Sequence, residues 1–126
     1  MRIVDSAHWT LPWLILVVGM YAVIRFARGY IGESVFTKTD QRLVAVFSGL
    51  MDLQGALGLI FFLVSGLEGI GFPSNRILHG SFMLVAVIIP HISSRWGDSD
   101  DQTRHLNNFF GILSSFLIML VGLSLI

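Results

Sequence analysis

The chain has 126 residues, of which 54% are hydrophobic and only 13% charged, whereas a water-soluble domain carries about 25% charged residues. Its net charge of zero offers no basic surface to nucleic acid. Because it has no cysteine, disulfides, thiolate metal sites, iron–sulfur clusters and c-type haem attachment are excluded. The composition therefore predicts a protein that lies mostly in lipid.

Four apolar segments are long enough to cross a bilayer, whose core of about 30 Å needs roughly 20 helical residues. They cover residues 11–30, 43–67, 77–93 and 107–126. Pro12 is expected in the first turn of the first helix, where proline is tolerated, and Thr37 and Thr39 are expected N-caps of the second. No small-residue cleavage pattern follows the first apolar run, so we expect a retained helix and not a signal peptide. The sequence predicts an all-α single domain over all 126 residues, an integral membrane antiparallel four-helix bundle.

The positions of lysine and arginine predict how the bundle is oriented. Six basic residues border the first and third connections: Arg25, Arg28, Lys38, Arg42, Arg95 and Arg104. Only Arg2 and Arg76 lie at the opposite end. Since cytoplasmic loops are the more basic ones, we expect both termini on the outer side. Arg25 and Arg28 are expected to extend to the inner lipid head groups.

Asp52 and Gln54 are polar residues inside the second span. Asp52 lies about 15 Å along the helix from Arg42, near the expected bilayer midplane, where a carboxylate must be protonated, paired or facing water or protein. It shares a helical face with small residues: Ser48, Gly49, Gly55 and Ala56. Asp52 is therefore either a structural hydrogen-bonding group or a carboxylate that binds a proton or a cofactor. Gln54 points about 200° away and is expected to contact a second helix.

The four histidines fall at the ends of the predicted spans, one pair in each leaflet. His8 and His79 lie at the outer ends, and His91 and His105 at the inner ends. Facing imidazoles can hold b-type haem, although histidine is also an ordinary interfacial residue. The step from His79 to His91 turns about 120°, so the two share a face only if Pro90 redirects His91. On the fourth span one face holds His105, Asn108, Ile112, Ser115 and Gly122.

Several short motifs together resemble those of a known family. They are Phe36-Thr37-Lys38-Thr39-Asp40, Asp52-Leu53-Gln54 with Gly58, His79 and His91, accompanied by His8, Trp13, Tyr21 and Arg95. Over nearly its whole length the chain resembles small four-span bacterial membrane proteins that are often labelled cytochrome b-like. The resemblance implies a b-type-cytochrome-like bundle with His8, His79 and His91 as candidate haem ligands. The chain departs from the family pattern at Leu78, where the family has an acid, and at Pro12, where it has a basic residue.

Three functions remain open from the sequence. The first is a membrane subunit of a respiratory or photosynthetic electron-transfer complex that binds haem b and moves electrons between quinone and a partner. The second is a cofactor-free accessory subunit that packs against a larger complex. The third is a small proton-coupled transporter that uses Asp52, which the lack of inverted repeats disfavours. We expect no enzymatic activity of its own, a location in the bacterial cytoplasmic membrane, and other membrane subunits, lipid and quinone as partners.

Overall fold

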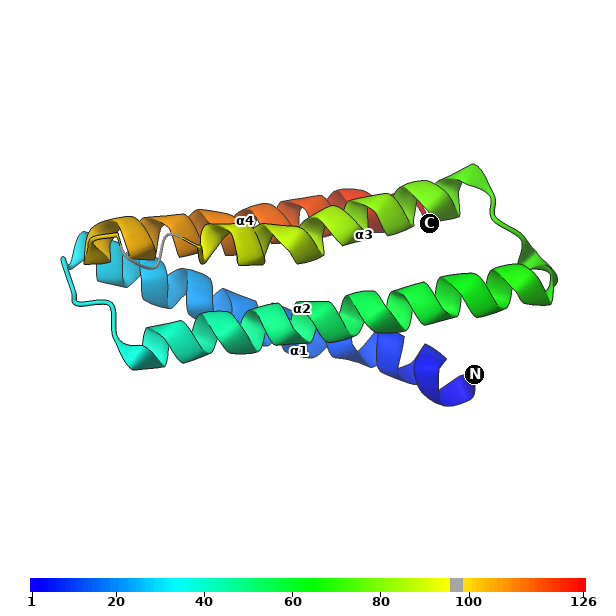
Figure 1. Cartoon of the computed structure of the whole chain (residues 1–126), viewed down its shortest axis with the longest axis horizontal. Helices are drawn as coiled ribbons and strands as arrows, with labels where there is room; N and C mark the ends of the chain where they lie inside the picture. Colours follow the sequence, from blue (N-terminus) through cyan, green and yellow to red (C-terminus); the bar gives the residue numbers. More distant parts are fainter. Residues whose placement is uncertain (96–98) are drawn as a thin grey trace.

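The computed structural model describes residues 1–95 and 99–126, and these residues form an all-α fold (Figure 1). Its elements are α1 (Arg2–Ile31), α2 (Lys38–Ser65), the short π-helical extension η1 (Gly66–Ile70), α3 (Ser74–Ser93) and α4 (Asp101–Leu123). Consecutive helices run in opposite directions, and both termini lie at the same end of the bundle. Each helix packs against two neighbours, in the order α1, α2, α3, α4 and back to α1.

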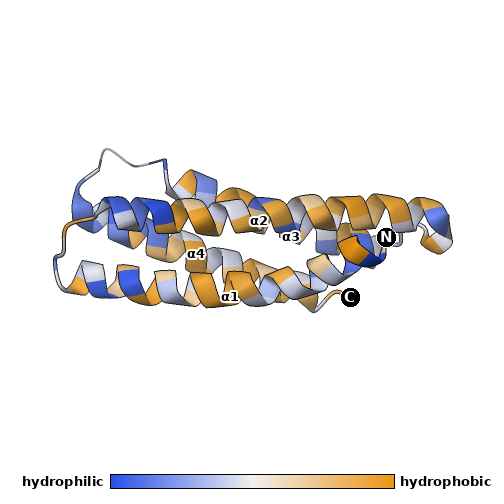
Figure 2. Cartoon of the chain, turned by 90° about the horizontal axis from the view of Figure 1, so that it is seen from below, coloured by the Kyte–Doolittle hydropathy of each residue, from blue (hydrophilic) through white to orange (hydrophobic). Residues whose placement is uncertain are grey.

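Four helices in the described part of the chain are each long and apolar enough to cross a membrane. The prediction of an all-α chain with four membrane-length helices is therefore confirmed. Many large apolar side chains point outward, among them Trp13, Val17, Leu84 and Leu120, each at least 60% exposed. Hydrophilic residues gather at the end of the bundle that holds the α1–α2 and α3–α4 connections (Figure 2). Lipid would remove the penalty of exposing this apolar surface to water.

Helices α1 and α4 begin earlier than the predicted spans, because polar residues continue both helices beyond the apolar stretches that hydropathy detects. The N-cap of α4 is Asp100, whose carboxylate accepts a hydrogen bond of 2.8 Å from the backbone N–H of Thr103. This hydrogen bond holds the pKa of Asp100 below its usual value. As a consequence of the longer helices, His8 and His105 both lie inside helices and not at their ends.

The start of α2 is joined to the last turns of α1 by an ion pair. Thr37 is the N-cap, as predicted, whereas Thr39 lies inside the first turn, and Asp40 completes a capping box with Thr37. The buried Asp40 carboxylate also accepts a hydrogen bond from the guanidinium of Arg25. The expectation that Arg25 extends to the lipid head groups was therefore wrong. The antiparallel hairpin brings the N-terminal carboxylate of α2 beside this arginine, and the arginine pairs with it.

Pro12 lies well inside α1, so its predicted place in the first turn was wrong. Proline has no N–H to donate to the carbonyl four residues earlier, which here belongs to His8. The amide nitrogen of Gln54 on α2 donates to that carbonyl at 3.1 Å. A side chain of the neighbouring helix thus replaces the backbone hydrogen bond, as is required where no water is available.

Pro90 likewise leaves the carbonyl of Ala86, four residues earlier in α3, without a backbone N–H donor. The hydroxyl of Ser115 on α4 lies 3.0 Å from this carbonyl and also 3.0 Å from the carbonyl of Gly111 on its own helix, so its one proton is shared between them. Ser115 and Ala86 are completely buried. Ser115 belongs to the face of α4 that the sequence singled out, and every residue of that face is buried in the structure. Among the polar residues of this face, Ser115 donates to the backbone of a neighbouring helix, whereas His105 donates to the α1–α2 loop and Asn108 to its own helix.

Candidate functional site

A cavity of about 460 Å³ lies between α2, α3 and α4. It exists because α3 ends early. His91 lies two residues before the end of α3 yet contacts Asp52, which is midway along α2. Both α2 and α4 continue past the end of α3 toward the α1–α2 connection (Figure 1). Among the described residues, α3 therefore leaves the first half of α2 uncovered on the side that faces it.

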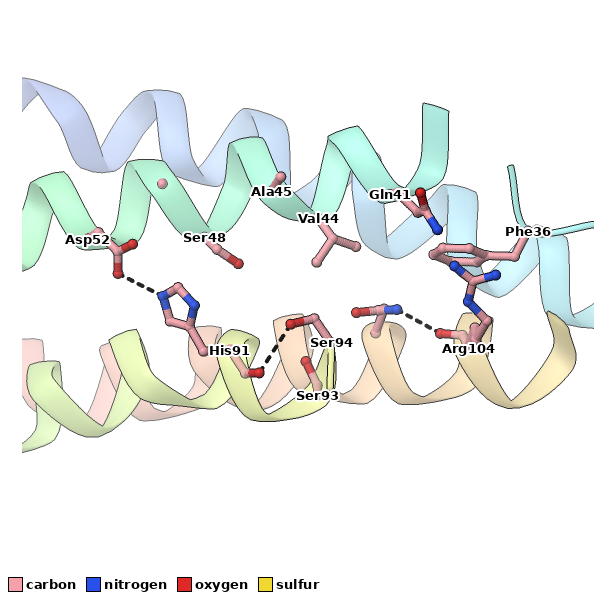
Figure 3. A pocket seen from close by; sticks show the side chains of 12 residues that line it. Phe36, Gln41, Val44, Ala45, Ser48, Asp52, His91, Ser93, Ser94 and Arg104 are labelled. Atoms are coloured by element: carbon pink, nitrogen blue, oxygen red, sulfur yellow. Dashed lines mark hydrogen bonds and ion pairs between the residues drawn. The ribbon is translucent and has the colours of Figure 1, made fainter. Parts of the chain in front are cut away.

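Polar and small side chains dominate the lining of this cavity (Figure 3). The lining residues are Phe36 from the α1–α2 loop, Gln41, Val44, Ala45, Ser48, Gly49 and Asp52 from α2, His91, Ser93 and Ser94 from the end of α3, and Arg104 and Asn108 from α4. The α2 residues recur every three or four positions, so they form one face of the helix about 16 Å long. The cavity therefore reaches from the loop end of the bundle to the middle of α2.

Asp52 and His91 contact each other at the end of the cavity that is farthest from the α1–α2 loop. Nε2 of His91 lies 2.8 Å from Oδ1 of Asp52 (Figure 3). Since a carboxylate accepts hydrogen bonds, Nε2 donates, and the neutral imidazole keeps a free lone pair on Nδ1. The two side chains are about half exposed, at 52% for Asp52 and 50% for His91. Asp52 thus has the partner that a structural role requires and also the open space that proton exchange requires.

Arg104 and Asn108 shape the cavity nearer the loop end. The guanidinium of Arg104 lies over the ring of Phe36, 4.2 Å from its centroid. Asn108 is only 6% exposed, and its Nδ2 donates to the carbonyl of Arg104 at 2.9 Å. Its Oδ1 has no hydrogen-bond partner among the described residues. A buried amide oxygen without a donor indicates that water or a ligand group completes this site.

His8 and His79 lie nearer the end of the bundle that holds the termini, and each is tied to a different helix. Nδ1 of His8 lies 3.0 Å from the amide nitrogen of Gln54, which donates, so the neutral ring carries its proton on Nε2. The helix contact expected of Gln54 is made here, with α1. Nδ1 of His79 donates to the carbonyl of Gly122 on α4 at 2.9 Å, which leaves the Nε2 lone pair free.

His105 is buried in the core of the bundle. It is 2% exposed, and its Nε2 donates to the carbonyl of Ser34 in the α1–α2 loop at 3.1 Å. The ring contacts Phe26 and Phe36, with centroids 6.0 and 5.1 Å away. Gly29 lies against the same ring, and a Cβ there would overlap the imidazole. His105 therefore fastens the α1–α2 loop to α4.

Haem ligation by these histidines was the most specific expectation from the sequence. A ligating imidazole presents one free nitrogen to iron while the other N–H donates to a carbonyl, carboxylate or water. His79 has this arrangement, whereas His8 has the opposite tautomer, and His91 and His105 both use Nε2 as a donor. In residues 1–95 and 99–126 no hydrogen bond joins the members of either expected pair, and no three His, Asp or Glu residues cluster as a metal site. Ligation of haem b therefore stays a prediction. His79 is the histidine whose hydrogen bond leaves the ring nitrogen Nε2 free to bind iron.

Sequence reasoning missed Arg104 as a cavity residue and did not anticipate the contact between His91 and Asp52. The signal for the missed contact lay in the early end of α3, which the polar residues after Ser93 already indicate. The 120° turn between His79 and His91 did predict different neighbours for the two rings. In the structure His79 contacts α4 and His91 contacts α2.

No protein-family model, curated protein or solved structure matches this chain. The resemblance to cytochrome b-like four-span proteins stays a prediction. The fold and the cavity together define a class of protein. It has four helices of membrane-spanning length, and a hydrogen-bonded carboxylate and imidazole, Asp52 and His91, at one end of a cavity lined largely by polar residues.

Proposed function

We propose that this chain is a membrane subunit of an electron-transfer complex, and that its half-exposed Asp52–His91 pair exchanges protons with a quinone. One observation carries the proposal: an acid–base pair joined at 2.8 Å borders a polar cavity in a bundle whose outer surface is largely apolar. Ionisable residues inside membrane-length helices mark proton relays and ion pathways. We place the complex in the bacterial cytoplasmic membrane, with both termini on the outer side because the loop-end residues are the more basic ones.

The chemistry of quinone reduction suits this pair. A quinone that receives two electrons from a haem or iron–sulfur centre of a partner subunit also takes up two protons, one on each oxygen. A doubly protonated His91 can give the proton on Nδ1 to a quinone oxygen, so that an O–H bond forms as the N–H bond breaks. The Asp52 carboxylate stabilises the imidazolium before that transfer by accepting the hydrogen bond from Nε2. Afterwards the neutral ring is ready to be protonated again on Nδ1.

A haem b bound by this chain is part of the same proposal. His79, near the end of the bundle that holds the termini, would hold this haem, which would supply one-electron chemistry there. His8 could join it only after its hydrogen bond to Gln54 changes. A cofactor-free accessory subunit is the second candidate, and the observation in its favour is that helices account for nearly all described residues.

The test begins with the purified chain and the subunits that accompany it from native membranes. A haemochrome assay with a reduced-minus-oxidised spectrum decides on haem, and quinone turnover decides on function. Asp52→Asn should lower proton-coupled turnover by about 10² or more, because a neutral amide no longer stabilises the His91 imidazolium. Glu68→Gln, an exposed acid-to-amide change in η1, is the matched control and should have no effect. If no redox subunit accompanies the chain, or if Asp52→Asn retains full turnover, the proposal is wrong.

A further inference from the structure

Polar side chains line the cavity at several positions between the loop end of the bundle and the Asp52–His91 pair. Gln41 in the first turn of α2 and Arg104 in the first turns of α4 lie at its entrance, and Ser48 lies one turn before Asp52. The volume of about 460 Å³ far exceeds the ~15 Å³ of probe-occupied space that one water molecule needs. The cavity is therefore wide enough and polar enough to hold a file of water molecules.

Beyond the pair, α2 and α3 are in close contact. Gly55 lies one turn after Asp52 on α2, and the side chain of Val87 on α3 fits against it so closely that an added Cβ would lie 3.1 Å from Val87 Cγ2. Beside the cavity, Phe47 and Met51 are at most 2% exposed and belong to the core of the bundle. A path that is open at one end and ends on a titratable pair has the form of a half-channel.

We infer that this cavity is a water-filled half-channel that brings protons from the loop end of the bundle to the Asp52–His91 pair. The inference deepens the proposed function and rests on it for the use of the proton, but the water path can be tested separately. Asn108 supports water as the occupant, since its Oδ1 is buried without a donor from the described residues. Within the described part of the chain, the lining residues that carry or can carry charge are Asp52 on α2, His91 on α3 and Arg104 on α4, and α1 contributes none.

The proton step needs only the atoms that the structure brings together. A hydronium ion in the path gives its proton to Nδ1 of His91 and is left as water. The resulting imidazolium carries a proton on each nitrogen, and its Nε2–H bond points to Asp52. His91 can then release one of these two protons, either the Nε2 proton to Asp52 or the Nδ1 proton to a substrate oxygen, and is left as a neutral ring. Arg104 remains charged throughout, because a guanidinium does not deprotonate in proteins.

Single cysteines can test for the water path, because the natural chain contains none. A thiol reacts with a charged, membrane-impermeant methanethiosulfonate only as the thiolate, and thiolates form in water. Ser48→Cys in the intact protein in sealed vesicles should react when the reagent is on the side of the α1–α2 loop, at least about tenfold faster than the control cysteines. Reagent on the other side should give no labelling.

Two control positions separate water from lipid and from protein interior. Val46→Cys lies on α2 two residues away, is 52% exposed and does not line the cavity, so it reports on lipid. Ser115→Cys is completely buried and reports on the protein core. If Ser48→Cys reacts no faster than Val46→Cys, lipid and not water fills the cavity, and the inference is overturned.

Leucine substitutions at two glycines test whether filling the cavity slows labelling, one inside the cavity and one outside it as the matched control. A Cβ at either Gly49 or Gly80 would meet open space, but only Gly49 lines the cavity. Gly49→Leu should slow the labelling of Ser48→Cys at least about tenfold, and Gly80→Leu should leave it unchanged. Labelling that Gly49→Leu does not slow would place the water path elsewhere.

The outcomes for the inference and for the proposed function are distinct. Absence of labelling, together with a loss of quinone turnover in Asp52→Asn, would reject the half-channel and leave the quinone site standing. Labelling as expected without any quinone turnover would keep the water path and reject the electron-transfer function.

Discussion

Ser115 on α4 donates its hydroxyl to the carbonyl of Ala86 on α3, which is the carbonyl that Pro90 leaves without a backbone donor. Ser115→Ala should therefore lower the free energy of unfolding by about 1 kcal/mol, because a buried carbonyl loses its partner. Reversible unfolding in mixed detergent measures the change. In a Pro90→Ala background the backbone N–H returns, and the same serine substitution should have a clearly smaller effect. Equal effects in both backgrounds would refute the link.

Asp40 joins the capping box of α2 to Arg25 on α1. Asp40→Asn removes the carboxylate that accepts from both Thr37 and Arg25, and should lower stability by about 1–3 kcal/mol. A drop in the thermal midpoint of the detergent-solubilised protein reports this change. Asp101→Asn, in the first turn of α4, is the control and should stay within about 0.5 kcal/mol of the natural protein.

His79 and His105 should respond differently to alanine. If haem b is bound, His79→Ala removes its absorption bands while the helix content is unchanged, because the ring contributes one hydrogen bond to Gly122. His105→Ala should lower stability by about 2–4 kcal/mol, since a buried ring leaves a cavity between Phe26 and Phe36. Spectra and unfolding curves of both variants check this. A loss of haem bands in His105→Ala at unchanged stability would contradict the structural role.

The cap of α4 should depend on pH. The pKa of Asp100 is lowered in the folded chain by the hydrogen bond from Thr103, so its stabilising effect is present above the unfolded value of about 3.9. It is lost as the pH falls through the lower, folded pKa. Hydrogen exchange at the Thr103 amide should accelerate in this acidic range beyond its intrinsic pH dependence. Asp100→Asn keeps an acceptor that does not titrate, and should abolish the extra acceleration.

Sequence patterns predicted the features that depend on local chemistry. Thr37 was one of two threonines expected as N-caps because their hydroxyls precede the apolar run, and the residues that share one face of α4 were identified because helical periodicity alone defines that face. The position of Pro12 in its helix was missed, since hydropathy does not detect polar residues that continue a helix. The cavity could not be predicted either. It depends on how far α3 is displaced along α2, which brings His91 level with Asp52 and which no single helix encodes.

The two prolines have a consequence for how these helices are aligned along their axes. In a regular helix every turn has its backbone hydrogen bonds made within the helix. Two apolar helices can therefore shift along each other by one turn at a small cost in free energy. The carbonyls of His8 and Ala86 have no backbone N–H donor within their own helix and depend on a side chain of the neighbouring helix. One turn of α1 and one turn of α3 therefore differ from the regular turns. A slipped pairing would leave such a carbonyl without a donor in a medium that cannot supply one. Pro12 therefore favours a single axial alignment of α1 with α2, and Pro90 favours a single axial alignment of α3 with α4.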